Sequence, residues 1–276
     1  MAKRSILLVI LAITLMLSII HPALAGRSDP QEQGRVEYDA KENKATVGSN
    51  GYTFSFVGRG SPPFYRFSNP TNRTYLVKFM KLIEFADEDG DGKYSPKEAI
   101  LRGSYSLPSA DWGFTINDAA QTFTFSTPSK ARSPAISLVN HYAPTQPERL
   151  KFDIQITNWA WHDATTMLAL QFDVISEQDL DTATRELENG VELAGNAYFE
   201  SSTIAMVNNE EDTVGITIAE KSVFLAYPHF DNLEHDPSLG FRGVPGVIGR
   251  ITTTHYSYMV LIASVLLVIG VYSRRR

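Results

Sequence analysis

The chain is 276 residues long, contains no cysteine and carries a formal net charge of −6 at pH 7. The lack of cysteine excludes a disulfide framework and a thiolate metal site. With Lys3, Arg4 and the three C-terminal arginines set aside, 20 Lys and Arg remain against 31 Asp and Glu, a net charge of −11. This acidic balance argues against nucleic acid and anionic lipid as partners, because both require a basic patch.

The N-terminus has the pattern of a signal peptide. Two basic residues precede the apolar stretch 5–20, and Ala23 and Ala25 supply the small side chains that signal peptidase requires. We expect cleavage after Ala25, so that residues 1–25 form the signal peptide; an uncleaved N-terminal anchor is the alternative. The polar residues 26–34 are predicted to be a flexible N-terminus.

Residues 35–227 are predicted to form a β-rich domain outside the membrane. A tight-turn signal at 50–51 precedes residues 52–56, which alternate between apolar and polar side chains, and residues 152–156 alternate in the same way. Many short segments of this kind, separated by turn residues, predict a mainly β fold, an antiparallel β-sandwich. The clearest helical prediction in this domain is the acidic segment 177–188.

Residues 87–98 read DEDGDGKYSPKE and resemble the calcium-binding loop of EF-hand proteins. Calcium takes six to eight oxygen ligands, and Gly92 permits the sharp bend that brings them together. In the EF-hand pattern Lys93 acts through its backbone carbonyl, Ser95 acts directly or through water, and Glu98 is bidentate. The resemblance covers this loop alone and implies a Ca²⁺ site with the ligands Asp87, Asp89, Asp91, Lys93, Ser95 and Glu98.

The surroundings of the loop depart from the EF-hand pattern. Tyr94 stands where an aliphatic residue usually pairs with a second loop, and no second loop of this type occurs in the sequence. The entering segment 75–85 fits a helix or a strand, and we favour a strand because the domain is β-rich. A short helix is expected to start at Ser95 and run through Ile100. The loop is therefore expected to stabilise the fold rather than act as a calcium sensor; a solvated acidic turn without metal is the alternative.

Two further clusters admit two interpretations each. Segment 229–236 holds two histidines and three acids, which could bind a transition metal, but a polar linker is the better interpretation. Trp159 and Trp161 lie two residues apart, and we interpret them as sheet core, with stacking on a sugar as the alternative.

The C-terminal part is predicted to carry the domain on a membrane. Residues 228–255, rich in Gly, Pro and Thr, are interpreted as a linker or stalk. Residues 256–273 are almost wholly apolar, and a helix of that length spans about 27 Å, close to the hydrocarbon thickness. The arginines at 274–276 mark the cytoplasmic side, although proteolytic processing of this end is an alternative.

These features predict a single-pass protein of the cell membrane with a calcium-binding domain outside. The expected role is binding, adhesion or envelope structure, with a protein or glycan as ligand. We found no Gly-x-Ser-x-Gly, His-Glu-x-x-His or phosphate-loop motif, so we predict no enzyme. The alternative is an anchored glycan hydrolase that uses a pair of carboxylates beside the tryptophans.

Overall fold

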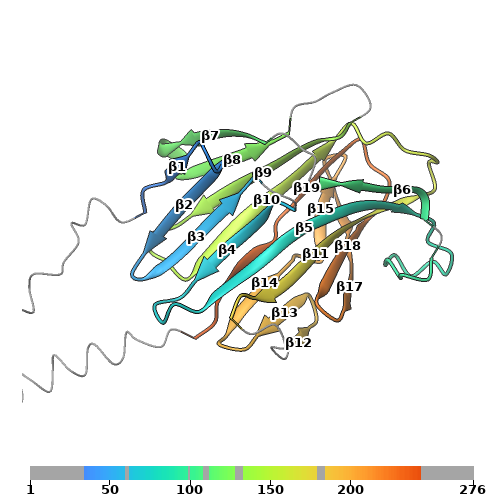
Figure 1. Ribbon diagram of the computed structural model, residues 1–276. Coiled ribbons are helices and arrows are strands. Elements are labelled where there is room, and N and C mark those ends of the chain that lie inside the picture. Colours follow the sequence, from blue (N-terminus) through green and yellow to red (C-terminus); the bar gives the residue numbers. More distant parts are fainter. Residues whose placement is uncertain are drawn as a thin grey trace, which may run out of the picture.

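The computed structural model describes residues 34–59, 62–98, 100–107, 112–127, 133–178 and 184–243. The described residues form two antiparallel β-sheets (Figure 1). The predicted signal peptide, the transmembrane segment 256–273 and the tail 274–276 lie outside them. Within the described part of the chain, no helix is long and apolar enough to cross a membrane.

One sheet has nine strands among the described residues. They are β1 (Glu37–Asp39), β2 (Lys44–Ser49), β3 (Tyr52–Val57), β4 (Phe64–Ser68), β5 (Thr74–Phe85), β6 (Ile100–Ser106), β11 (Met167–Ser176), β17 (Gly215–Ala219) and β18 (Ser222–Tyr227). Their order is β1-β2-β3-β4-β5-β11-β18-β17, with β6 paired to β5. The strand prediction for 75–85 is confirmed, because β5 covers this segment.

The second sheet has eleven strands in the described residues. They are β7 (Gly113–Asn117), β8 (Thr122–Ser126), β9 (Ala135–Tyr142), β10 (Arg149–Thr157), β12 (Thr184–Leu187), β13 (Gly190–Leu193), β14 (Ala197–Glu200), β15 (Ile204–Val207), β16 (Glu210–Thr213), β19 (Asn232–His235) and β20 (Ser238–Phe241). The path β12-β13-β14-β20-β10-β19-β15-β16 is joined at β10 by β9, which leads to β8 and β7. The short 3₁₀ helix η3 (Asp118–Ala120) connects β7 and β8.

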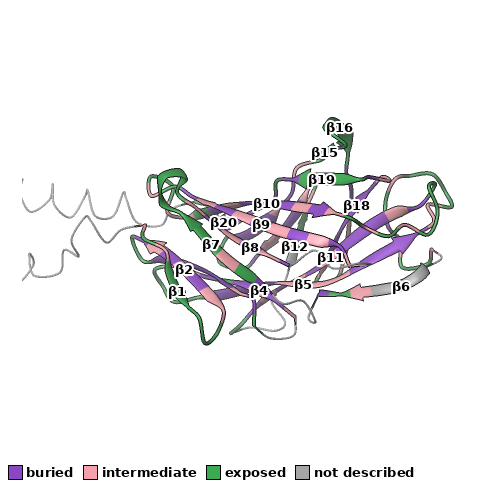
Figure 2. Cartoon of the chain, turned by 90° about the horizontal axis from the view of Figure 1, so that it is seen from above, coloured by how far each residue is buried: buried purple, intermediate pink, exposed green. Residues whose placement is uncertain are grey.

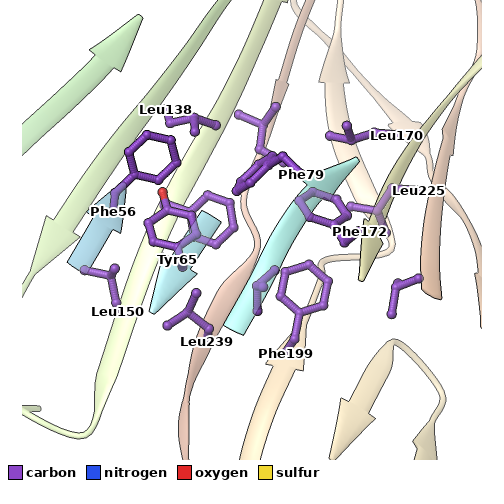
Figure 3. Packing of buried hydrophobic residues seen from close by; sticks show 14 of the residues in the cluster. Phe56, Tyr65, Phe79, Leu138, Leu150, Leu170, Phe172, Phe199, Leu225 and Leu239 are labelled. Carbon is purple, nitrogen blue, oxygen red and sulfur yellow. The ribbon is translucent and has the colours of Figure 1, made fainter. Parts of the chain in front are cut away.

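Aromatic rings cross between the two sheets and form the core. The ring centroids of Tyr65 and Phe152 lie 4.7 Å apart, and those of Phe172 and Phe199 lie 5.0 Å apart. Figure 3 shows Tyr65 and Phe172 among the buried side chains between the sheets. The hydroxyl of Tyr65 donates to Oδ1 of Asn140 at 2.5 Å, so this polar group is satisfied inside the core. The two sheets therefore pack face to face, as in a β-sandwich.

Three sequence predictions are wrong where the structure tests them. Segment 228–255 was predicted to be a linker, yet β19 and β20 lie in its first part, with Leu239 buried and Phe241 5% exposed. Residues 184–187 of the predicted helix 177–188 form strand β12. The expected helix after Ser95 does not form, because β6 begins at Ile100 and the intervening described residues form turns. Strand pairing outweighs local preference here: β19 and β20 pair with the distant strand β10, β12 pairs with the next strand, β13, and β6 pairs with β5.

The two ends of the described chain lie at one end of the domain. A Cβ on Gly34 would come 2.8 Å from Pro144, and the amide of Phe241 donates to the carbonyl of Glu148 at 3.0 Å, so both ends meet the turn between β9 and β10. The loop between β5 and β6 lies at the other end, at the right of Figure 1. Figure 2 shows buried residues along the strands between the layers and exposed residues on β7 and β16.

Candidate metal centre

The acidic loop 87–98 connects β5 to β6 at one end of the nine-stranded sheet. Phe85, the last residue of β5, pairs with Ile100, the first residue of β6. The ladder therefore holds the two ends of the loop side by side, and the loop is fixed by strands rather than by helices.

The three aspartates of the loop converge. Oxygen atoms of Asp87, Asp89 and Asp91 all lie within 4.8 Å of one another. Oδ1 of Asp87 accepts from the amide of Gly90 at 3.0 Å, and its Oδ2 accepts from the amide of Gly92 at 3.0 Å. Oδ1 of Asp91 accepts from the amide of Lys93 at 2.8 Å. Backbone amides thus orient the carboxylates toward one region.

Two glycines give the loop its shape. Gly90 and Gly92 have φ angles of +74° and +71°, in the left-handed region that residues with a Cβ rarely adopt. No atom lies within 4 Å of the position a Cβ would take at either glycine. Backbone conformation, rather than lack of space, therefore requires glycine here.

Glu98, the fourth acid of the predicted ligand set, has one oxygen without a partner. Its Oε2 accepts from the amide of Ser95 at 2.5 Å, whereas Oε1 is buried and has no hydrogen-bond partner. Burial raises the pKa of Glu98, and the charges of Asp89, Asp87 and Asp91 raise it further, against the opposing effect of the Ser95 amide. A cation placed among these groups would relieve both the repulsion and the unpaired oxygen.

The two remaining predicted ligands show fewer contacts. Oγ of Ser95 accepts only a long hydrogen bond, 3.4 Å, from the amide of Lys97. The side chain of Lys93 is exposed, and its amide faces Asp91. The structure thus brings together the three aspartates of the predicted ligand set and keeps Glu98, Lys93 and Ser95 in the same loop.

Tyr94 fastens the loop to the outer face of the nine-stranded sheet. Its ring is 5% exposed and packs 5.1 Å from Phe85 and 5.0 Å from Phe224. A Cβ on Gly215 of β17 would lie 1.9 Å from the carbonyl oxygen of Gly92, so the loop backbone also touches this strand. Tyr94 thus occupies the position that pairs with a second loop in EF-hand proteins, but in this structure it packs on a sheet.

The tryptophans lie in the loop between β10 and β11. Both are half-buried and pack against the main core. Nε1 of Trp159 donates to Oε2 of Glu84 at 3.2 Å, and Nε1 of Trp161 donates to the carbonyl of Phe230 at 2.7 Å. The ring of Trp161 stacks on His229 with a centroid distance of 4.5 Å. Their indole N–H groups are therefore used within the protein.

The histidines of segment 229–236 do not form a metal site together. His229 stacks on Trp161, whereas His235 is buried and its Nδ1 lies 2.8 Å from the hydroxyl of Tyr227. The neighbouring Glu234 and Asp236 approach Asp153 of β10, with oxygen atoms within 4.8 Å of one another. Sequence reasoning missed this group, because Asp153 is about 80 residues away along the chain.

A lysine already partners this second acidic group. Nζ of Lys151 lies 2.6 Å from Oδ2 of Asp236 and 3.6 Å from Oδ1 of Asp153, and His141 bonds to Asp153 at 2.6 Å. The group is therefore an ion-pair network on the outer face of the eleven-stranded sheet, whereas the loop acids have no basic partner among the described ion pairs.

The surface also has two polar hollows, of about 430 and 470 Å³. The first lies near the end of β20 and the second lies over β2 to β5. Neither is lined by the tryptophans or by the acidic loop. The first is lined by Gln146, Glu148, Arg149, Tyr198, Glu200, Phe241 and Arg242, and the second by Lys44, Thr46, Thr53, Ser55, Arg66, Ser68, Asn72, Thr74, Glu177 and Gln178.

Comparison with protein-family models and with curated proteins finds no match to this chain. The described residues form an antiparallel β protein with one group of converging loop carboxylates that has no basic partner among the described ion pairs.

Proposed function

We propose that the protein is a membrane-anchored surface protein whose outer β-sandwich domain binds calcium in loop 87–98. Its role is binding, adhesion or envelope structure, and the ion stabilises the domain. One observation carries the proposal: three aspartates converge in the loop, and their charges act on Glu98, whose buried Oε1 has no hydrogen-bond partner.

The chemistry of the loop favours calcium over other ions. The predicted ligands offer only oxygen atoms, which suit a hard cation. The number of carboxylates among them supports a site with six to eight ligands. The carbonyl of Lys93 and the hydroxyl of Ser95 would complete the shell in the EF-hand manner. Extracellular sites of this class bind calcium with dissociation constants of about 0.1–1 mM.

The flanking structure supports a stabilising role rather than a sensing role. A calcium sensor of the EF-hand type opens a pair of helices, whereas this loop is flanked by β5 and β6. Tyr94 packs on the sheet, so ordering the loop also orders a contact with the body of the domain. The loop lies at the opposite end of the domain from the C-terminal end of the described chain (Figure 1). Because the predicted membrane segment follows that end, the loop would lie far from the membrane.

Calcium is expected to raise the melting temperature of the protein. With a dissociation constant of 0.1–1 mM, 10 mM calcium adds about 1.4–2.7 kcal/mol to the free energy of unfolding. For a domain of this size the increase corresponds to about 3–10 °C, measured by calorimetry in calcium and in chelator.

Variants assign this effect to the loop. Asp87→Asn combined with Glu98→Gln should abolish the increase, because both carboxylates are lost while their shapes are kept. Glu88→Gln, an exposed acid of the same loop outside the ligand set, is the matched control and should keep the increase. An equal increase in the double variant, or none in the unmodified protein, would overturn the proposal.

A further inference from the structure

Loop 87–98 covers an apolar patch on the outer face of the nine-stranded sheet. The patch is separate from the main core and contains Ile83 and Phe85 of β5, Ala169 of β11, and Phe224 and Ala226 of β18. Tyr94 of the loop is the sixth buried member and packs on both phenylalanines. We call the five strand residues the outer patch.

The outer patch is buried at a place where the face of a sandwich is normally open to solvent. Elsewhere on the same face of the sheet the strands present polar side chains such as Lys44, Arg66 and Asp173, none of which is buried. The five patch residues are at most 6% exposed, and the loop supplies the only aromatic side chain of their cluster that comes from outside the strands. Without the loop, contiguous apolar surface would face water.

The outer patch continues toward an edge strand without charge. Strand β17 reads GITIA and ends the strand order of its sheet in the described part of the chain. It pairs with β18, so that Gly215 lies beside Ala226 and Thr217 beside Phe224. Natural edge strands usually carry a charge or a proline that prevents pairing with another chain, and β17 has neither.

The contact between the loop and this edge is close. A Cβ on Gly215 would overlap the carbonyl of Gly92, so the loop backbone rests on the first residue of β17. The amide of Gly92 also donates to Oδ2 of Asp87. The backbone that the carboxylates hold in place is thus the same backbone that covers the start of the edge strand.

We propose that calcium controls whether loop 87–98 covers the outer patch, and that a second copy of this chain binds the uncovered patch and the edge of β17 when calcium is absent. The inference rests on the proposed calcium site. Without the ion, mutual repulsion among the four carboxylates loosens the loop, and Tyr94 leaves the patch. The uncharged edge then pairs with the same edge of another molecule, which is the self-complementary contact of a two-fold dimer.

Sedimentation velocity of the protein at several concentrations tests the proposal. In 5 mM calcium a single monomeric species is expected, and in chelator a dimer that grows with protein concentration. Tyr94→Ser keeps every predicted calcium ligand but removes the side chain that covers the patch, so it should dimerise even in calcium.

Thr217→Lys places a charge on β17 beside Phe224 and should keep the protein monomeric in chelator. Thr213→Lys, at the exposed end of edge strand β16 in the other sheet, is its matched control and should still dimerise. If calcium raises the melting temperature but the chelated protein stays monomeric, this inference fails while the calcium site stands. If calcium has no effect on melting, the proposed function fails first. If Thr217→Lys and Thr213→Lys dimerise to the same extent in chelator, the outer patch and the edge of β17 are not the dimer surface.

Discussion

Replacing Glu84 with alanine is expected to lower the free energy of unfolding by about 3–4 kcal/mol. Glu84 is fully buried, and its carboxylate accepts from Nε1 of Trp159 at 3.2 Å, the amide of His162 at 2.7 Å and Oγ1 of Thr166 at 2.7 Å. Alanine leaves the donors of Trp159 and His162 without this acceptor, whereas Thr166 keeps the carbonyl of Asp163 at 2.7 Å. Each hydrogen bond to a charged group contributes about 1.5–3 kcal/mol. The loop between β10 and β11 should lose its attachment to β5.

Urea unfolding measures this loss, and two variants calibrate it. Glu84→Gln keeps one acceptor oxygen and should cost less than alanine. Glu177→Ala removes an exposed acid that pairs with Arg66 at the surface, and it should cost less than about 1 kcal/mol. A loss below about 1 kcal/mol for Glu84→Ala would show that the carboxylate does not hold the tryptophan loop.

The stability of the protein is expected to fall as the pH drops from about 6.5 to about 4, and His235 is expected to account for about 3 kcal/mol of the loss. The side chain is 1% exposed, and burial lowers its pKa to about 4, although Ser202 and Asp236 act in the opposite direction. The unfolded chain binds a proton near pH 6.5, whereas the folded protein does not until about pH 4. The stability present above pH 6.5 is therefore lost through this window.

Urea unfolding at pH 7.5 and pH 4.5, in chelator, tests the role of His235. His235→Gln has no proton to gain in this range, so its stability should change with pH by about 2–3 kcal/mol less than that of the unmodified protein. His162→Gln changes an exposed histidine and should leave the pH dependence as it was. The same slope in all three proteins would show that other groups cause the loss.

Local sequence pattern predicted the fold class and one strand that matters for the site. The alternating segments became strands, and 75–85 became β5 because apolar side chains on both faces of that strand are covered. The acids of the loop come together because their spacing within one turn-rich segment decides their geometry. Strand formation in these segments and the geometry of the acidic loop both depend on residues that are close together in the sequence.

What the sequence did not predict depends on distant partners. Strands β19 and β20 have four residues each, too few for a period to stand out among Gly and Pro, and they are strands because β10 pairs with both. Residues 184–187 are a separate case, because they pair with the next strand, β13, in a hairpin rather than with a distant segment. Nothing in the sequence pointed to a role for Glu84, because its burial depends on the loop between β10 and β11, which supplies its hydrogen-bond donors.

A calcium titration by isothermal calorimetry is the most direct test of a calcium site in this loop. One ion should bind per chain with a dissociation constant of about 0.1–1 mM, and combining Asp87→Asn with Glu98→Gln should remove the binding heat. An absence of heat up to 10 mM calcium, or unchanged binding in the double variant, would contradict a calcium site in loop 87–98.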